Sequence, residues 1–565
     1  MFLLNPHAYD QFYPDQCSRQ IMLKTIEFFE NKGKIKLKED DRNRVWYADF
    51  LNFQKNEGIF YTLLTPAKYG GDDCRWDTWR NSNFSEILAF YGLHYWYTWQ
   101  VTILGLGPLW MSQNEAIKQN TAELLKKGEV FAFGLSEKEH GADVYASEMT
   151  LFPIDQGSWR ARGGKYYIGN ANVAALVSNF GRFAGTDEYV FFATKSQHEK
   201  FECIRNLVNV QSYVAEYALH DYPVSQIDIL SRGSEAWNAA LNTVNMGKFN
   251  LGWASIGICT HAFYEAINHA ANRRLYNKFV TDFPHVQQLF VDAYSRLIAM
   301  KLFSLRAADY LRSASHQDRR YLLYNSLVKM KVTMQGEQVI DALWDIIAAR
   351  GFEKDVYFES ATRDIRALPK LEGTAHVNMA LVVKFMANYL FNPCEFLEIP
   401  KRADTADDRF IFNQGPTKGL SAVQFHDYNL VYGAVDTPNV SIFKEQIKAL
   451  KQFLLKTPPS PEQQKDVDFL LSLGELFTLI PYGQLILENV KIYGVSKELV
   501  EQIFDFMVRD FATYALQLYH KSGCTTEQME LCLAMIKKPA AGDRERFSLI
   551  WNEVYALEGC YEMNP

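Results

Sequence analysis

The segment Arg363–Thr374 holds the residues best suited to proton chemistry. It reads Arg363-Asp-Ile-Arg-Ala-Leu-Pro-Lys-Leu-Glu-Gly-Thr374, with Glu372 on a Gly-Thr turn just downstream of an Arg-Asp pair. A carboxylate presented on such a turn could remove a proton bound to carbon. A second interpretation is electrostatic, because Thr374 opens an apolar helical run and an acidic residue favours the N-terminus of a helix. The segment alone leaves both interpretations open.

The elements that must position Glu372 change in character along the chain. Residues 1–127 carry helical patterns separated by loops, and residues 128–235 carry short strand patterns with Gly-rich turns. Residues 236–400 return to long helical periods, which predict a four-helix bundle. A charged break opens a further helical region at 401–565. The predicted fold class is therefore mainly α with a central β domain: an N-terminal helical domain, a small β-barrel-like domain, a helical bundle and a helical extension.

Several individual elements follow from the same patterns. The predicted strands are 130–135, 158–162, 166–168 and 189–193, with a turn at Gly163-Gly164 between the second and third. The predicted helices include 84–99, 240–272 and 320–350, and another that begins near Thr374. The apolar stretch around Leu476–Leu487 contains Pro481 and is flanked by acidic residues, so it predicts a buried helix rather than a membrane span.

Bulk composition excludes several classes of protein. The 565 residues carry a net charge of -7 with no long basic tract, which argues against a nucleic-acid surface. The eight cysteines form no Cys-x-x-Cys pair, so neither a zinc site nor any other metal centre is predicted, and reduced thiols in a cytoplasmic protein fit better than a disulfide framework. The N-terminal residues have the features of neither a secretory signal nor a mitochondrial presequence.

Four motifs in order resemble the acyl-CoA dehydrogenase family. Phe131–Asp143 resembles its first strand-and-loop signature, and Gly164–Ala171 resembles its second β-domain signature. Arg273-x-x-Tyr276 stands where the family has Arg-x-x-Phe-Gly, and Arg363-Asp to Glu372-Gly-Thr matches the family in order and spacing. Each motif alone is weak, but together they cover roughly residues 10–395 on the expected elements.

The resemblance implies a reaction and a cofactor. Members of the family are FAD-dependent enzymes of fatty acid and lipid metabolism that oxidise acyl-CoA to trans-2-enoyl-CoA and pass electrons to an electron-transfer flavoprotein. By resemblance Glu372 removes the α-proton, while the flavin takes the β-hydride. A carboxylate is a weak base in water, so such a site must raise its pKa by excluding water. The backbone N–H of the same glutamate polarises the thioester carbonyl in this family.

The resemblance also assigns cofactor and substrate positions. Ser136 stands for a threonine that bonds the flavin, Tyr167 for a tryptophan beside the ring, and Arg273 for an arginine that reaches the FAD diphosphate of a neighbouring subunit. The complete cofactor set is Phe133, Leu135, Ser136, Tyr167, Gly169, Arg273, Tyr276, Arg350, Gly351, Thr374 and His376. The substrate set is Ala142, Phe249, Trp253, Leu371 and Gly373. Simple packing or surface roles remain the alternative for Phe133, Leu135, Arg273 and His376.

Three departures from the family pattern concern the cofactor and the thioester carrier. Gly169 replaces a threonine that bonds near the flavin N5, and Ala348-Ala-Arg-Gly351 replaces a Gly-Gly-x-Gly segment that approaches the diphosphate. Trp253 replaces an arginine near the expected CoA path. These departures keep two alternatives open: an acyl-CoA oxidase or acyl-carrier-protein dehydrogenase, and a non-catalytic scaffold subunit poor in flavin. The oligomer implied by Arg273 would be a homodimer or tetramer, with the 401–565 extension packing within it.

Overall fold

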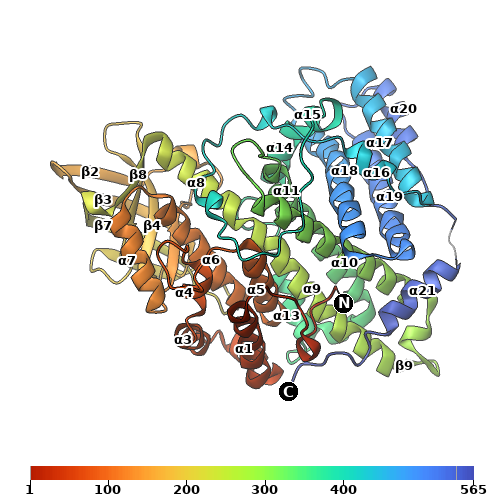
Figure 1. Ribbon diagram of the computed structural model, residues 1–565, viewed down its shortest axis with the longest axis horizontal. Coiled ribbons are helices and arrows are strands. Elements are labelled where there is room, and N and C mark those ends of the chain that lie inside the picture. Colours follow the sequence, from red (N-terminus) through yellow and green to blue (C-terminus); the bar gives the residue numbers. More distant parts are fainter. Residues whose placement is uncertain (1, 542–543) are drawn as a thin grey trace. The chain divides into compact units, whose positions relative to one another are not determined.

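The computed structural model describes residues 2–541 and 544–565, which form two compact units. The sheet unit comprises Asp10–Asn250, Ala403–Lys418 and Met563–Pro565; the bundle unit comprises the residues up to Tyr9, Leu251–Arg402 and Gly419–Glu562. Figure 1 shows the chain coloured along its sequence. The N-terminal helices and the β segment therefore fall in one unit, and the C-terminal helices share a unit with the bundle.

Seven helices begin the sheet unit, and several start at side-chain caps. Asp15, Asp77 and Asn114 each accept a hydrogen bond from a backbone N–H of the first helical turn. The prediction of one helix over 84–99 is wrong because the helix breaks at Gly92, where a Cβ would lie 2.8 Å from the His94 ring. The helices are α1 (Gln16–Lys32), α2 (Lys34–Asn43), α3 (Ala48–Asn56), α4 (Ile59–Leu64), α5 (Thr78–Tyr91), α6 (Leu93–Met111) and α7 (Glu115–Lys126).

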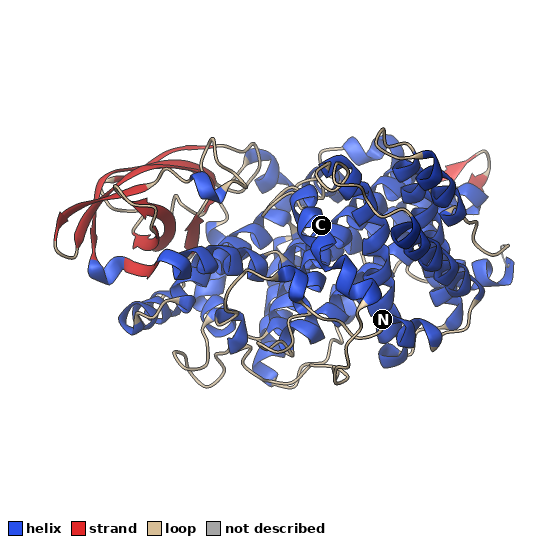
Figure 2. Ribbon diagram, turned by 90° about the horizontal axis from the view of Figure 1, so that it is seen from above, coloured by secondary structure: helices blue, strands red, loops and turns tan. Residues whose placement is uncertain are grey.

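A mixed eight-stranded sheet follows, shown as red arrows in Figure 2. Its order is β6-β7-β3-β2-β4-β5-β8, with β1 paired in parallel to β4. The predicted turn at Gly163-Gly164 is absent from the described sheet, because β3 runs through both glycines while paired to β7. The strands are β1 (Phe131–Gly134), β2 (Thr150–Asp155), β3 (Ser158–Gly169), β4 (Leu176–Phe183), β5 (Tyr189–Thr194), β6 (Phe201–Asn206), β7 (Val214–Ser225) and β8 (Ile229–Arg232).

One strap of chain returns to the sheet unit from later in the sequence. We call Ala403–Lys418 the strap. The N–H of Asp408 donates to the carbonyl of Trp76 at 2.7 Å, and the Asp408 carboxylate accepts from the N–H of Thr78 at 2.7 Å. The Asp407 carboxylate accepts from the N–H of Trp76 at 2.8 Å. These bonds tie the strap to the start of α5.

The predicted helix over 240–272 is in fact two helices. They are α8 (Gly233–Gly247) and α9 (Phe249–Asn272), separated at Lys248. The predicted helix over 320–350 is also interrupted, by a π-helical turn η5 (Val328–Val332) between α11 (Tyr321–Leu327) and α12 (Thr333–Ile347). The remaining bundle elements are α10 (Pro284–Arg312), η6 (Ala348–Phe352), α13 (Tyr357–Asp364), α14 (Ala375–Val382) and α15 (Met386–Phe391).

The C-terminal helices pack on the bundle through apolar and charged contacts. The Arg296 guanidinium of α10 makes two 2.9 Å bonds to the Asp510 carboxylate of α19, and both side chains are buried. Within the described residues, one helix, α18, is long and apolar enough to cross a membrane, but 83% of its most apolar window is buried. These helices are α16 (Tyr428–Gly433), α17 (Pro438–Lys456), α18 (Val467–Tyr493), α19 (Lys497–Tyr519), α20 (Thr526–Met535) and α21 (Arg544–Tyr555).

Candidate active site

The loop between α13 and α14 presents Glu372 on an unusual backbone. Glu372 has φ 54 and Gly373 has φ 84, so both occupy the left-handed region. For a residue with a Cβ this conformation costs roughly 1–2 kcal/mol, and it persists only where surrounding contacts impose it. Leu371, Glu372 and Gly373 are half-buried, whereas Thr374 and His376 are exposed. Strained backbone of this kind is concentrated at functional sites in proteins.

Hydrogen bonds on both sides of Glu372 impose that conformation. The Pro369 carbonyl accepts the N–H of Ala375 at 3.0 Å and the Lys329 ammonium at 2.6 Å. The Asn378 amide donates to the carbonyls of Gly373 at 3.2 Å and Thr374 at 3.1 Å. Hydrogen bonds therefore fix the loop at Pro369 on one side and at Gly373 and Thr374 on the other, with Glu372 between them.

The N-terminus of α14 also explains why Thr374 follows the glutamate. The Thr374 hydroxyl accepts the N–H of Val377 at 3.3 Å, which is an N-cap. The hydrogen-bonding cap of α14 is therefore Thr374, while the electrostatic effect of Glu372 on the same helix end stays a prediction. The assignment of Thr374 and His376 to the cofactor stays a prediction.

A second carboxylate lies in the neighbourhood of α14. Glu475 of α18 is largely buried, and burial raises its pKa, while the charges of Lys331 and His376 oppose that rise. The close approach of α18 depends on Gly474, where a Cβ would lie 2.4 Å from the Met379 sulfur of α14. Sequence reasoning missed Glu475 because it gave the extension no position relative to the base.

In the sheet unit, Glu137 has every feature of a structural carboxylate. It accepts bonds from the Ser147 hydroxyl at 2.6 Å, from the N–H groups of Glu148 and Met149 at 2.7 and 3.1 Å, and from the Lys165 ammonium at 2.7 Å. Burial raises the pKa of Glu137, but Lys165 and these hydrogen bonds outweigh it and leave the pKa below its usual value. Burial lowers the pKa of Lys165 to about 8 against the charge of Glu137.

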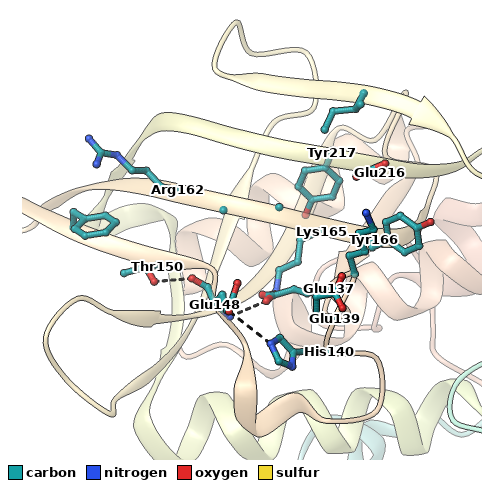
Figure 3. Close-up of a pocket in the computed structure, with 15 residues that line it drawn as sticks. Glu137, Glu139, His140, Glu148, Thr150, Arg162, Lys165, Tyr166, Glu216 and Tyr217 are labelled. Atoms are coloured by element: carbon teal, nitrogen blue, oxygen red, sulfur yellow. Dashed lines mark hydrogen bonds and ion pairs between the residues drawn. The ribbon is translucent and has the colours of Figure 1, made fainter.

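A cavity of about 420 Å³ opens beside this pair. Figure 3 shows Lys165 extending from β3 toward Glu137, with His140 and Glu148 on the loop below. The lining mixes acidic and basic side chains, and Glu137 pairs with Lys165 while Glu148 lies 3.8 Å from His140. Because these charges face one another, the cavity favours no single class of charged ligand.

The predicted flavin contacts of the sheet unit lie around the same loop and the end of β3. Phe133 is buried in β1, and Leu135 and Ser136 are half-buried just beyond it. The Ser136 hydroxyl donates to the Tyr166 carbonyl at 2.7 Å, so its bond to the strand is already made. Tyr167 has φ 65 and is 59% exposed, which leaves its ring accessible.

A packing contact explains the glycine at position 169. A Cβ there would lie 2.6 Å from the Tyr97 ring and 2.8 Å from Val101, both on α6. The aromatic ring of Tyr97 therefore occupies the space that a threonine side chain would need. Tyr97 is half-buried on a helix whose other residues are nearly all buried.

The bundle unit gathers the predicted diphosphate contacts. Nη1 of Arg350 lies 2.8 Å from Nδ1 of His269, and Nη1 of Arg273 lies 3.5 Å from Nε2 of the same imidazole. Burial, followed by the charges of Arg350 and Arg273, lowers the pKa of His269 to about 4. The neutral imidazole has one acceptor nitrogen, so it can accept from only one of the two guanidinium groups, and Nδ1 with its 2.8 Å contact to Arg350 is the better placed. The sequence could not show that both guanidinium groups lie next to His269. Tyr276 is 91% exposed on the hairpin next to Arg273.

The Ala348–Gly351 segment keeps a glycine-like backbone despite its alanines. Ala348 has φ 56, and a Cβ on Gly351 would lie 2.9 Å from the Trp344 indole nitrogen. Ala348 thus adopts a backbone conformation that glycine favours, at a cost in strain, and the expected obstruction by the side chains of this segment stays a prediction.

The predicted substrate residues have unequal access. Ala142 is exposed, Phe249 is 1% exposed and Trp253 is fully buried. The Lys301 ammonium lies 4.9 Å from the centre of the Trp253 ring, which is a cation–π contact in the bundle core. That contact gives Trp253 a packing role, and its assignment to substrate binding stays a prediction without support from its position.

Comparison with known proteins supports the family and the fold. Residues 235–387 match the model of the acyl-CoA dehydrogenase, C-terminal domain. The 3-(aryl)acrylate reductase of Clostridium sporogenes is 22% identical over 334 residues, which cover 57% of this chain and 86% of that protein. The glutaryl-CoA dehydrogenase of Desulfococcus multivorans is 23% identical over 385 residues, covering 63% and 93%.

Solved structures extend the likeness to the whole chain. An acyl-CoA dehydrogenase complexed with FAD from Bacillus anthracis superposes with a TM-score of 0.74 at 15% identity, over 98% of this chain and 96% of that one. Butyryl-CoA dehydrogenase from Megasphaera elsdenii has a TM-score of 0.58 at 19% identity, over 66% and 98%. The predicted fold class is confirmed, C-terminal helices included. Residues 235–387 therefore match the C-terminal domain of acyl-CoA dehydrogenases, and the chain has the fold of solved members of that family.

Proposed function

We propose that this protein catalyses FAD-dependent α,β-dehydrogenation of an acyl-CoA thioester to the trans-2-enoyl thioester, with Glu372 as the base. The observation that carries the proposal is the left-handed Glu372, held by hydrogen bonds within the span that matches the family model. A strained, half-buried carboxylate on a fixed loop is suited to meet a substrate at a defined position.

The chain's own groups account for the proton half of the reaction. Glu372 takes the α-proton from the carbon next to the thioester carbonyl and becomes neutral. Its backbone N–H is the proposed donor to the carbonyl oxygen, where negative charge develops. A bound apolar acyl chain beside Leu371 would exclude water and strengthen the base. FAD, when bound, supplies the acceptor for the hydride that leaves the β-carbon.

The donor chemistry of the described residues fits FAD. The guanidinium groups of Arg273 and Arg350, both next to His269, supply the positive charge and donors that a diphosphate needs. The exposed Tyr167 offers an aromatic face for a flat ring. Within the sheet unit, the residues that the resemblance assigns to the cofactor are Phe133, Leu135, Ser136, Tyr167 and Gly169. Within the bundle unit, it assigns Arg273, which would reach the FAD of a neighbouring subunit, with Tyr276, Arg350, Gly351, Thr374 and His376.

An absorbance scan followed by anaerobic titration tests the proposal. The purified protein should show the two visible bands of oxidised flavin, and a suitable acyl-CoA from a panel of chain lengths should bleach them. Absence of flavin after reconstitution with FAD would contradict the proposal and favour a scaffold subunit. Flavin that is bleached by acyl carrier protein thioesters but by no acyl-CoA would move the substrate to the carrier-bound class.

We further propose an electron-transfer flavoprotein as the acceptor, in a cytoplasmic homo-oligomer. Support comes from the likeness to a caffeyl-CoA reductase-Etf complex subunit of Acetobacterium woodii, at 22% identity over 49% of this chain and 73% of that protein. Stopped-flow reoxidation of the reduced flavin by electron-transfer flavoprotein, faster than by oxygen, is the expected result. Stoichiometric hydrogen peroxide would instead assign an oxidase.

A further inference from the structure

Two lysines of the π-helical turn η5 are fully buried. Lys329 and Lys331 are both 0% exposed, in the apolar stretch Val328–Val332. Charged groups are almost never buried completely unless they are paired or hydrogen-bonded, so each needs a physical explanation. π-helical turns are rare and are often found at functional sites.

The two ammonium groups serve different elements. Lys331 donates to the Tyr514 hydroxyl of α19 at 3.1 Å, which joins η5 to the C-terminal helices. Lys329 donates to the Pro369 carbonyl at 2.6 Å, three residues before Glu372. η5 also packs against α14, which starts directly after the Glu372 loop. One short turn thus reaches the loop of the proposed base with one lysine and the extension with the other.

The bond to Pro369 acts where the loop has the least freedom to compensate. Proline has a fixed φ, so the Pro369 carbonyl can change direction chiefly through rotation about ψ. The same carbonyl closes the loop by accepting the Ala375 N–H at 3.0 Å. Between these two points Glu372 and Gly373 adopt their left-handed conformations. A charge-assisted bond is stronger than a neutral one, and so it can hold a conformation that the chain would otherwise leave.

We propose that Lys329 is a positioning residue for Glu372. It fixes the Pro369 carbonyl and thereby keeps the left-handed turn that aims the carboxylate. The proposal rests on the proposed function for its catalytic consequence, but the structural effect on the loop is independent of it. Lys331 provides a matched control, because it is equally buried in the same turn and its ammonium contacts Tyr514 instead of the loop.

The first test measures the loop directly. In Lys329→Met, the amide of Ala375 should exchange its hydrogen for deuterium at least about tenfold faster, because the carbonyl that accepts it has lost its anchor. In Lys331→Met, exchange at Ala375 should match the wild type. Unchanged exchange in Lys329→Met, or equal acceleration in both variants, would overturn the proposal whether or not the protein is a dehydrogenase.

The second test measures the chemistry in the FAD-loaded protein. A displacement near 1 Å can cost roughly 100-fold in rate, so Lys329→Met should slow bleaching by acyl-CoA by about that factor. The dissociation constant for acyl-CoA and the flavin spectrum should stay within twofold of the wild type. Bleaching at the wild-type rate in Lys329→Met would overturn the proposal, whereas absence of bleaching in the wild type would instead overturn the proposed function.

Retained folding is expected because the Pro369 carbonyl keeps the Ala375 N–H as a partner. Lys329→Gln distinguishes loss of the hydrogen bond from a folding defect, because the glutamine amide can still donate to the Pro369 carbonyl from the space left by the lysine. Partial recovery of both the exchange rate and the bleaching rate in Lys329→Gln is expected. Recovery of neither, in a protein with a wild-type melting temperature, would contradict a role for the donated hydrogen bond.

Discussion

Two loops of this protein each combine a glutamate with a fully buried lysine, and they use the lysine in opposite ways. In the sheet unit, Lys165 binds the Glu137 carboxylate itself at 2.7 Å. In the bundle unit, Lys329 binds a backbone carbonyl three residues before Glu372. The first arrangement satisfies the acid with donors, while the second fixes the backbone that carries the acid.

The difference teaches how to separate structural from chemical carboxylates. The pKa of Glu137 is lowered because its neighbours stabilise the charged carboxylate. Its backbone is not among those with positive φ. Glu372 sits on a left-handed backbone, so its surroundings stabilise a position. A strained backbone can fix the direction in which an acidic side chain points. Proton transfer from carbon requires such a fixed orientation of the base.

The largest expected effect is on the loop in the bundle unit. Glu372→Gln removes the proposed base with little change in shape and should slow bleaching by acyl-CoA by between about 100- and 10,000-fold. The flavin absorbance should remain, because Glu372 is not among the residues assigned to the cofactor. Anaerobic stopped-flow absorbance measures both.

Glu475→Gln is the control for that variant. Glu475 is the buried carboxylate of α18 near His376, and its replacement should leave bleaching within a few-fold of the wild type. Loss of bleaching in Glu475→Gln together with normal turnover in Glu372→Gln would move the base to α18 and remove the contrast between the two loops.

The next effect concerns the sheet unit and stability. Lys165→Met leaves the Glu137 charge buried without its partner and should lower the free energy of unfolding by about 3–5 kcal/mol. Denaturation in urea measures the change. Lys195→Met, an exposed lysine of the same unit, should stay within about 0.5 kcal/mol of the wild type. An equal loss of unfolding free energy in both variants would show that the Lys165–Glu137 ion pair does not account for the effect.

A pH series sharpens the assignment of Glu137. Its pKa in the folded protein lies below the ordinary 4.5, so its charge stabilises the fold above pH 4.5. That contribution is lost as the pH falls through the folded-state value. Glu137→Gln cannot titrate, so the stability difference between wild type and variant should be constant near neutral pH and shrink in acid. A difference that is independent of pH would argue against a charged Glu137.

The smallest expected effect is on stability and tests backbone strain at Ala348, a position without an acidic side chain. Ala348 has φ 56, so Ala348→Gly should stabilise the bundle unit by about 1 kcal/mol. Ala349→Gly, one residue on and outside the left-handed region, should instead destabilise it by roughly 0.5–1 kcal/mol. Thermal melting compares the two, and the same sign for both would contradict the strain argument.

The family resemblance and the fold class could be predicted from the sequence more fully than the local geometry of the site. The Arg363–Thr374 spacing and the β-domain signatures led to a family resemblance that the domain match over residues 235–387 supports, and helical periodicity led to the confirmed fold class. The sequence could not show the left-handed Glu372, because the hydrogen bonds around that turn include one from Lys329 to Pro369, two residues 40 positions apart. Nor could it join α19 to the bundle, because Arg296 and Asp510 lie 214 residues apart.

One feature that the sequence reasoning missed, the pair of buried lysines in η5, is visible as a pattern in the sequence. The stretch Val-Lys-Met-Lys-Val at 328–332 places two charges two positions apart in an apolar helical pattern. In an α-helix such residues point to nearly opposite sides, so at least one of them had to be buried and to need a partner. The His269 imidazole between Arg273 and Arg350 had no such trace, since its partners come from separate elements. The roles of the individual cofactor and substrate residues stay predictions.

The strap at Ala403–Lys418 has a consequence for how the protein is made. Trp76 and Thr78 leave the ribosome more than three hundred residues before the aspartates that bind them. These hydrogen bonds therefore cannot form during synthesis until residues 251–402, about half of the bundle unit, have also emerged. Contacts so distant in sequence slow folding and prolong the exposure of apolar surface. In a nascent chain, the start of α5 is thus expected to lack these hydrogen-bond partners until the strap is synthesised.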